Sequence, residues 1–258
     1  MDFFSLKIFL EEKYRLYNQT SFIKDDPISI PHRFSKKEDI EISGFFAATF
    51  SWGRRETIIQ KSGLLMEMMD NSPFDFILNS SKKDINAFGK FKHRTFNGSD
   101  CINFLLSLKN IYQNLGGLET VLGKPIKNNN YEGGIIENIS FFRKSFFLNK
   151  NFYSSGRHVS NPQKKSSLKR INMFLRWMVR KDKNGVDFGL WKNLRPYQLL
   201  CPLDVHSGNV ARKLGILTRK QNDLKAVIEL TDFLKKFDAE DPVKYDFALF
   251  GLGVFEKF

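Results

Sequence analysis

Residues 166–180 read Ser-Ser-Leu-Lys-Arg-Ile-Asn-Met-Phe-Leu-Arg-Trp-Met-Val-Arg, and their spacing predicts an amphipathic helix. Apolar side chains recur along one face of this helix: Leu168, Ile171, Phe174, Leu175 and Met178. Polar and basic side chains follow the same spacing along another face: Lys165, Lys169, Asn172, Arg176 and Arg180. We therefore expect one face to pack in the core and the other to face a partner.

The predicted helix lies in the most basic part of the chain. Between residues 157 and 183 there are nine basic side chains and one acidic side chain, Asp182. The basic ones are Arg157, Lys164, Lys165, Lys169, Arg170, Arg176, Arg180, Lys181 and Lys183. The whole chain carries a net charge of +13, and excess cations attract polyanions and release counterions on contact. Nucleic acid is the expected partner, although a solvated basic face is the common alternative for such a helix.

Residues 201–215 read Cys-Pro-Leu-Asp-Val-His-Ser-Gly-Asn-Val-Ala-Arg-Lys-Leu-Gly and predict the start of another helix. Pro202 stops the preceding element, and Asp204 is a favoured residue for the N-cap that follows. An ordinary capping aspartate is the simpler interpretation of this position. A capped carboxylate is nevertheless fixed in direction, which is what stabilising a developing positive charge requires. Asp204 is therefore a candidate catalytic residue.

Other segments also have helical patterns. They are residues 3–16, a segment from an N-cap at Ser35 with Glu38 to Gly53, residues 54–69, residues 100–115, and residues 135–147 after an Asn- and Gly-rich loop at 128–134. No sustained alternation of apolar and polar residues predicts strands. We expect an all-α fold in a single unit, residues 1–258, with two lobes and a cleft between them. The predicted lobes are residues 35–150, and residues 1–34 together with 151–258.

The composition excludes several classes of protein. A chain of 258 residues with 41% hydrophobic residues buries a sizeable core without disulfides. Cys101 and Cys201 have no metal-ligand spacing, so we expect no metal site and no cofactor. The N-terminal stretch has no uninterrupted apolar run, so we expect no membrane association. The expected setting is the cytoplasm, with the protein a monomer at the nucleoid.

The segment Pro202–His206, preceded by a basic helix and followed by Val210–Gly215, resembles the catalytic segment of helix-hairpin-helix DNA glycosylases. In that superfamily it is most similar to the archaeal 8-oxoguanine DNA glycosylases, whose lysine lies far before the aspartate. Here 35 positions separate Lys169 from Asp204, and Lys169 with Arg176 fits the family's pattern on the lysine helix. Two departures are plain. Residues 181–191 lack the usual Leu-Pro-Gly-x-Gly hairpin, and no four-cysteine cluster follows the aspartate.

The whole chain is also similar to a bacterial family of unknown function, typical of Bacteroidetes-like genomes. The shared segments are Asp-Pro-Ile-Ser-Ile-Pro-His-Arg-Phe at 26–34 and Asp-Phe-Ala-Leu-Phe-Gly-Leu-Gly at 246–253.

The glycosylase resemblance implies base-excision repair of double-stranded DNA that contains a damaged base such as 8-oxoguanine. Lys169 would attack C1′ of a flipped nucleotide, and the Schiff base would permit strand scission, with Asp204 stabilising the transition state. Attack needs a neutral amine, which neighbouring cations such as Arg176 would favour. Expected DNA contacts are Lys165, Arg176, Arg180, Lys181, His206 and Arg212. Expected stacking partners of the flipped base are Trp52, Phe45 and Phe46.

Two alternatives keep the basic surface without the chemistry. One is a non-catalytic DNA-binding protein with this fold, and the other is a helical RNA-binding module. Catalysis predicts a covalent adduct at Lys169, whereas either alternative predicts salt-sensitive binding with no product. The sequence favours catalysis, because binding alone needs no lysine and aspartate in this arrangement.

Overall fold

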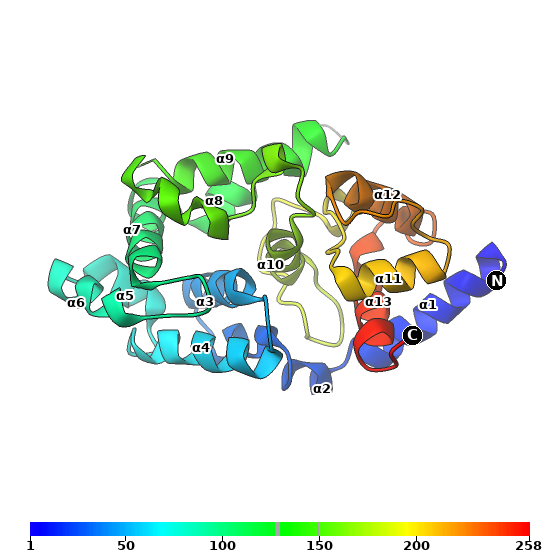
Figure 1. Cartoon of the computed structure of the whole chain (residues 1–258), viewed down its shortest axis with the longest axis horizontal. Coiled ribbons are helices and arrows are strands. Elements are labelled where there is room, and N and C mark those ends of the chain that lie inside the picture. The colour runs from blue at the N-terminus through cyan, green and yellow to red at the C-terminus, as the bar shows by residue number, and fades with distance from the viewer. Residues whose placement is uncertain (127–129, 149) are drawn as a thin grey trace. The chain divides into compact units, whose positions relative to one another are not determined.

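The computed structural model of the chain describes residues 1–126, 130–148 and 150–258 (Figure 1). In these ranges the regular elements are helices, and the only β-structure is two isolated bridges. The prediction of an all-α fold is therefore confirmed. The expected Asn- and Gly-rich loop at 128–134 lies partly outside the described residues.

The α-helices of the described residues have the following bounds. They are α1 Phe3–Tyr17, α2 Thr20–Ile23, α3 Lys37–Phe50, α4 Arg55–Glu67, α5 Pro73–Asn79, α6 Lys82–Asn86, α7 Gly98–Asn114, α8 Leu118–Leu122, α9 Glu137–Phe146, α10 Lys169–Val179, α11 Val205–Lys213, α12 Leu224–Lys235 and α13 Tyr245–Val254. Short 3-10 turns connect them: η1 Pro27–Ser29, η2 Pro31–Arg33, η3 Ala87–Lys90, η5 Lys150–His158, η6 Pro162–Lys164, η7 Pro196–Gln198 and η8 Pro242–Lys244. A π-helical turn, η4 Glu132–Ile136, precedes α9.

The chain divides into two compact units. The terminal unit comprises Met1–Lys24, Ile126–Ile135 and Asn161–Phe258, and the middle unit comprises Asp25–Pro125 and Ile136–Ser160. These bounds correct the predicted lobes at residues 25–34, 126–135 and 151–160. Apolar burial explains the first shift, because Pro27 and Ile28 are buried in the turn that packs against α3 and α4.

The core of the middle unit surrounds α3, which is buried from Asp39 to Phe50. The ring of Phe45 packs against those of Phe104 and Phe142, with centroids 6.0 and 5.5 Å apart. Phe45 and its neighbour Phe46 are both buried core residues. The prediction that they stack on a flipped base is wrong, because both rings are buried against other rings of the middle unit.

Trp52 also belongs to the middle unit but is not fully buried. Its ring lies 4.9 Å from that of His93 and 5.8 Å from that of His158. His158 in turn hydrogen-bonds to the buried carboxylate of Asp100. The proposed role of Trp52 in base stacking stays a prediction.

The first turn of α3 differs from the sequence prediction. Lys36 is the N-cap, and its side chain makes no capping hydrogen bond, so the predicted cap at Ser35 is wrong. Ser35 lies one residue before the cap position. Glu38 and Asp39 in the first turn interact favourably with the helix dipole instead.

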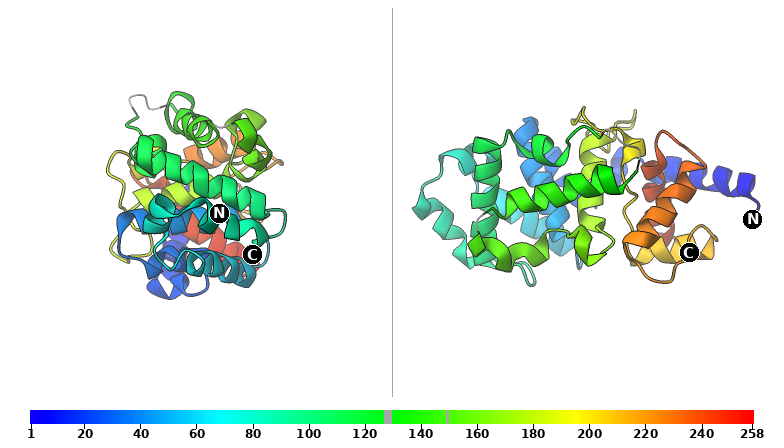
Figure 2. Two further views of the ribbon diagram at one scale, coloured as in Figure 1. Left: turned by 90° about the vertical axis from the view of Figure 1, so that its left-hand side faces the viewer. Right: turned by 90° about the horizontal axis from the view of Figure 1, so that it is seen from above.

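In the terminal unit, α13 packs against both α1 and α11 (Figure 1). Both chain ends belong to this unit, and Figure 2 marks them. Gly251 makes the contact with α1 possible, because a Cβ atom at this position would lie 2.0 Å from the ring of Tyr17. Any larger residue would push the two helices apart. In the described part of the chain, no helix combines the length and apolar character needed to cross a bilayer.

Candidate active site

Lys169 is the first residue of α10, and a strained residue precedes it. Leu168 has a left-handed backbone, with φ 54° and ψ 21°, which costs a residue other than glycine about 1 kcal/mol or more. The buried side chain of Leu168 holds this conformation in place. The strained backbone of Leu168 therefore sets the position of Lys169 at the start of α10.

Asp204 is the N-cap of α11, as the sequence predicts. Its Oδ1 accepts hydrogen bonds from the backbone N–H of Ser207, at 2.9 Å, and from the Ser207 hydroxyl, at 3.2 Å. Its Oδ2 lies 4.0 Å from Nζ of Lys169, and both side chains are 24% exposed. The capping box thus holds one carboxylate oxygen while the other faces the lysine.

Asp246 is a third ionisable residue of this site, which the sequence analysis did not select. It lies in the first turn of α13, is buried, and forms an ion pair with Arg176. Burial raises the pKa of Asp246 to about 6, with Arg176 and Lys169 opposing the rise and Asp204 adding to it. Lys169, Asp204 and Asp246 therefore form one electrostatic cluster. The signal in the sequence was a single acidic residue inside the apolar segment 245–254.

The pH dependence of stability tests the environment of Asp246. Protonated Asp246 favours the folded state, because its folded pKa of about 6 exceeds its ordinary value of 3.8. This contribution is fully present below pH 3.8 and is lost as the pH rises through 6. The wild type is therefore expected to lose roughly 3 kcal/mol of folding free energy from this residue as the pH rises. Asp246→Asn should not show this loss. Urea denaturation from pH 4 to 7 measures it, with exposed Asp25→Asn as control. An unchanged pH profile in Asp246→Asn would contradict the assignment.

Arg176 and Arg180 do not face a partner, so their predicted DNA contacts are wrong. Their exposed fractions are 4% and 1%. Arg176 pairs with Asp187 as well as Asp246, and Arg180 pairs with several carboxylates. The partners of Arg180 are Asp182 at 2.5 Å, Asp187 at 3.0 Å and Asp241 at 2.8 Å. The basic face of α10 is thus neutralised inside the terminal unit, and the helix is buried on all sides from Ile171 to Val179.

The pairing of Arg176 also changes the expected activation of Lys169. A guanidinium already paired with two carboxylates is a weaker source of positive potential than a free cation. The charges that accompany Lys169 in this site include the carboxylates of Asp204 and Asp246. The structure therefore does not show Arg176 as a free cation beside Lys169.

The other predicted DNA contacts lie in different environments. Lys165, Lys181 and His206 are exposed. The guanidinium of Arg212 donates instead to the carbonyl of Arg219, at 2.8 Å, and to the side chain of Asn222, at 2.6 Å. Arg212 therefore holds a neighbouring loop, and this role was not predicted.

The loop 181–191 does not present free amides as a phosphate-binding hairpin would. The backbone N–H groups of Asn184 and Gly185 both donate to Oδ1 of Asp182, at 2.9 and 3.0 Å. A Cβ atom at Gly189 would lie 2.3 Å from Cβ of Lys181, so this glycine serves packing. Gly185 lies in open space but its N–H is engaged by Asp182, and Gly189 is packed against Lys181.

A second loop, residues 216–223, lies beside Asp204. Nδ2 of Asn222 donates to the carbonyl of Asp204, at 2.9 Å. The N–H of Leu224 donates to the carbonyl of Lys165, at 3.0 Å. Lys165, Lys220 and Lys225 are exposed, and within the described residues no carboxylate pairs with them. We call these three residues the basic rim.

A family model described as "Protein of unknown function (DUF2400)" matches residues 26–255. The chain belongs to this family. The DUF2400 match includes Lys169, Asp204 and Asp246, together with both segments, 26–34 and 246–253, that carry the whole-chain resemblance. No curated protein and no solved structure matches the chain. In the described residues, no cluster of three His, Cys, Asp or Glu side chains could hold a metal ion.

Proposed function

We propose that this DUF2400 protein is a DNA glycosylase with strand-cleaving activity, and that Lys169 is its nucleophile. The observation that carries the proposal is the 4.0 Å approach of Lys169 to Asp204 at a partly exposed site. The left-handed residue Leu168 precedes Lys169, and a capping box fixes the direction of the Asp204 carboxylate. Both features fit a lysine placed for attack.

The proposed reaction begins with a nucleotide flipped out of the duplex. The nitrogen of Lys169 forms a bond to C1′, and the bond between C1′ and the base breaks. The electron pair leaves with the base, which takes up a proton. Opening of the sugar gives a Schiff base on Lys169, and removal of a C2′ proton then expels the 3′ phosphate. Asp204 stabilises the positive charge that develops at the sugar.

The lysine proton must leave before attack. The carboxylate of Asp246 belongs to the same electrostatic cluster, and burial raises its pKa to about 6. A group with a pKa near neutrality exchanges a proton more readily than an ordinary carboxylate does. Asp246 is therefore proposed to help remove this proton, through its electrostatic coupling to Lys169 and Asp204.

Base release on duplex DNA containing 8-oxoguanine tests the function. The wild type is expected to release the base, and Asp204→Asn to release it about 10²- to 10³-fold more slowly, because electrostatic stabilisation is lost. Binding of the same duplex should change little. Absence of base release from 8-oxoguanine and from other lesions would leave a basic DNA- or RNA-binding protein.

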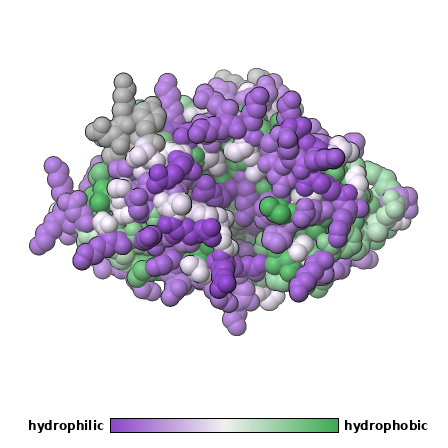
Figure 3. Space-filling view, in the orientation of Figure 1, coloured by the Kyte–Doolittle hydropathy of each residue, from purple (hydrophilic) through white to green (hydrophobic). Residues whose placement is uncertain are grey.

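The basic rim replaces α10 as the proposed phosphate-binding surface. Hydrophilic side chains cover most of the face of the chain shown in Figure 3. The loop that carries Lys220 lies next to Asp204, because Asn222 of this loop donates a hydrogen bond to the carbonyl of Asp204. Each phosphate contact contributes about 0.9 to the slope of log K against log salt concentration.

Neutralising two rim lysines is therefore expected to weaken DNA binding and flatten its salt dependence. Lys220→Gln combined with Lys225→Gln should reduce the slope by about 2. Fluorescence anisotropy of a labelled duplex across a salt series measures the slope. Lys82→Gln with Lys83→Gln, on exposed positions of α6, is the matched control. Equal changes in both double variants would contradict a localised phosphate surface.

A further inference from the structure

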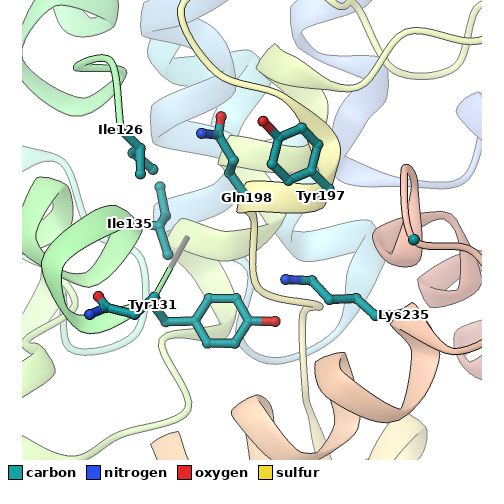
Figure 4. Close-up of a pocket in the computed structure, with 8 residues that line it drawn as sticks. Ile126, Tyr131, Ile135, Tyr197, Gln198 and Lys235 are labelled. Carbon is teal, nitrogen blue, oxygen red and sulfur yellow. The ribbon is translucent and has the colours of Figure 1, made fainter. Parts of the chain in front are cut away.

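A separate pocket of about 140 Å³ lies in the terminal unit. Its walls come from Ile126, from residues of the segment 130–135, from the turn η7, and from the C-terminal end of α12 with the residues just after it. Figure 4 shows Tyr197 and Gln198 on one side of the pocket, and Tyr131 and Lys235 on the other. The pocket shares no lining residue with the cluster of Lys169, Asp204 and Asp246.

Several polar groups of this pocket can donate to a ligand. Oε1 of Gln198 is occupied by the backbone N–H of Arg195, at 2.9 Å, which leaves the amide Nε2 as a donor. The hydroxyl of Tyr131 is not such a donor, because its O–H is used in a hydrogen bond to Asp232, at 3.0 Å. Within the described residues, no ion pair involves Lys235, and no hydrogen bond engages the hydroxyl of Tyr197. A set of donors with one cation fits a ligand that is rich in acceptors and carries negative charge.

Lys235 is the cationic group of the pocket. Its ammonium lies 4.4 Å from the centroid of the Tyr131 ring. Burial lowers the pKa of Lys235, and the charge of Asp232 opposes this. Lys235 is half-buried beside an aromatic ring, so it attracts a bound anion more strongly than a lysine at an open surface would.

The size and the aromatic walls limit the rest of the ligand. A cavity of about 150 Å³ accommodates a benzene-sized ring, and Tyr197 offers an aromatic ring on which a planar base can stack. The ring of Tyr131 already carries the Lys235 ammonium on one face. A single six-membered ring matches this volume better than a fused purine does. We propose that the pocket binds a pyrimidine nucleotide, with its ring against Tyr197 and its phosphate at Lys235.

Such a nucleotide is either a free molecule or part of a DNA strand. If it is part of a strand, the pocket holds a nucleotide next to the one that is cleaved, and this possibility rests on the proposed function. Binding of thymidine 5′-monophosphate and of a thymidine hexanucleotide, each measured by calorimetry on the full chain, distinguishes the two. Stronger binding of the monophosphate indicates a free nucleotide, and stronger binding of the hexanucleotide indicates a strand.

Lys235→Gln is expected to weaken the better ligand by about tenfold or more, because a charge-assisted contact is lost. Lys236→Gln, at an exposed neighbouring position of the same helix end, is the matched control and should bind within about twofold of the wild type. Ala239→Leu, which places a larger side chain in the lining of the pocket, should also weaken binding. Lys169→Gln should bind as the wild type does, which separates this site from catalysis.

The proposal is overturned if neither ligand binds saturably, or if Lys236→Gln weakens binding as much as Lys235→Gln does. Equal binding of adenosine and thymidine monophosphates would overturn the assignment of a single ring. If the protein binds the nucleotide but releases no base, the proposed glycosylase function is contradicted and the proposed nucleotide site still holds.

Discussion

Replacing Lys169 with glutamine is expected to abolish strand cleavage and base release, with a loss of about 10³-fold or more in rate. The side chain is proposed as the nucleophile, and removal of a nucleophile generally costs more than removal of any supporting group. Glutamine keeps a polar side chain of similar length at the start of α10. Single-turnover cleavage of a lesion-containing duplex on a denaturing gel measures the effect.

Lys165→Gln is the matched control for this experiment. Lys165 is exposed and precedes the same helix, but it does not contact Asp204 within ion-pair distance. It should lower DNA affinity modestly and leave the single-turnover rate at saturating protein within a few-fold of the wild type. Wild-type rates in Lys169→Gln would show that another residue performs the attack.

The largest effect on stability is expected at Arg180. Arg180→Met removes a buried guanidinium from Asp182, Asp187 and Asp241, and from the hydroxyl of Tyr14, to which it donates at 2.7 Å. Breaking a buried ion pair by removing one partner costs about 3 to 5 kcal/mol, because the remaining charges stay buried without compensation. Urea denaturation at pH 7 measures this loss.

The loss at Arg180 should shrink as the pH falls. Burial raises the pKa of Asp241 against the opposing charge of Arg180. At Asp182 burial acts in the same direction, but hydrogen bonds from Asn18 and Arg180 and the charge of Arg180 outweigh it and lower the pKa. Without Arg180 both carboxylates take up protons at higher pH, so acid relieves the variant. Lys181→Met, at an exposed position, should change stability by less than about 0.5 kcal/mol. A loss of stability in Arg180→Met as small as that in Lys181→Met would contradict the buried network.

Local features of the site were readable from sequence. Asp204 follows a proline and precedes an apolar helical pattern, so its N-cap position was predicted and is confirmed. The helix around Lys169 was likewise predicted, although it begins at Lys169 and not at Ser166. Both features depend on neighbours a few residues away.

Long-range charge pairing was not readable. The basic face of α10 predicts exposure, because its own sequence contains no acid to neutralise it. One compensating carboxylate, Asp182, lies two residues after Arg180. The others come from residues 187, 241 and 246, and only the fold brings them to Arg176 and Arg180. Asp246 was missed for the same reason. Its relation to Asp204 depends on the packing of α11 against α13.

The same limit applies to aromatic side chains. Phe45 and Phe46 were plausible stacking groups by residue type, but their burial in the middle unit depends on rings from α7 and α9. With 27 phenylalanines in the chain, residue type alone does not distinguish core from site. Burial in the folded structure distinguishes the core phenylalanines from the site residues.

The most direct test of Lys169 as a nucleophile is to identify the residue that DNA traps. The wild-type protein is incubated with a duplex containing 8-oxoguanine in the presence of borohydride, which reduces a Schiff base to a stable bond, and the adduct is digested for mass spectrometry. We predict a nucleotide remnant on the peptide that contains Lys169. An adduct on another lysine, or no adduct from a preparation that releases the base, would contradict the account.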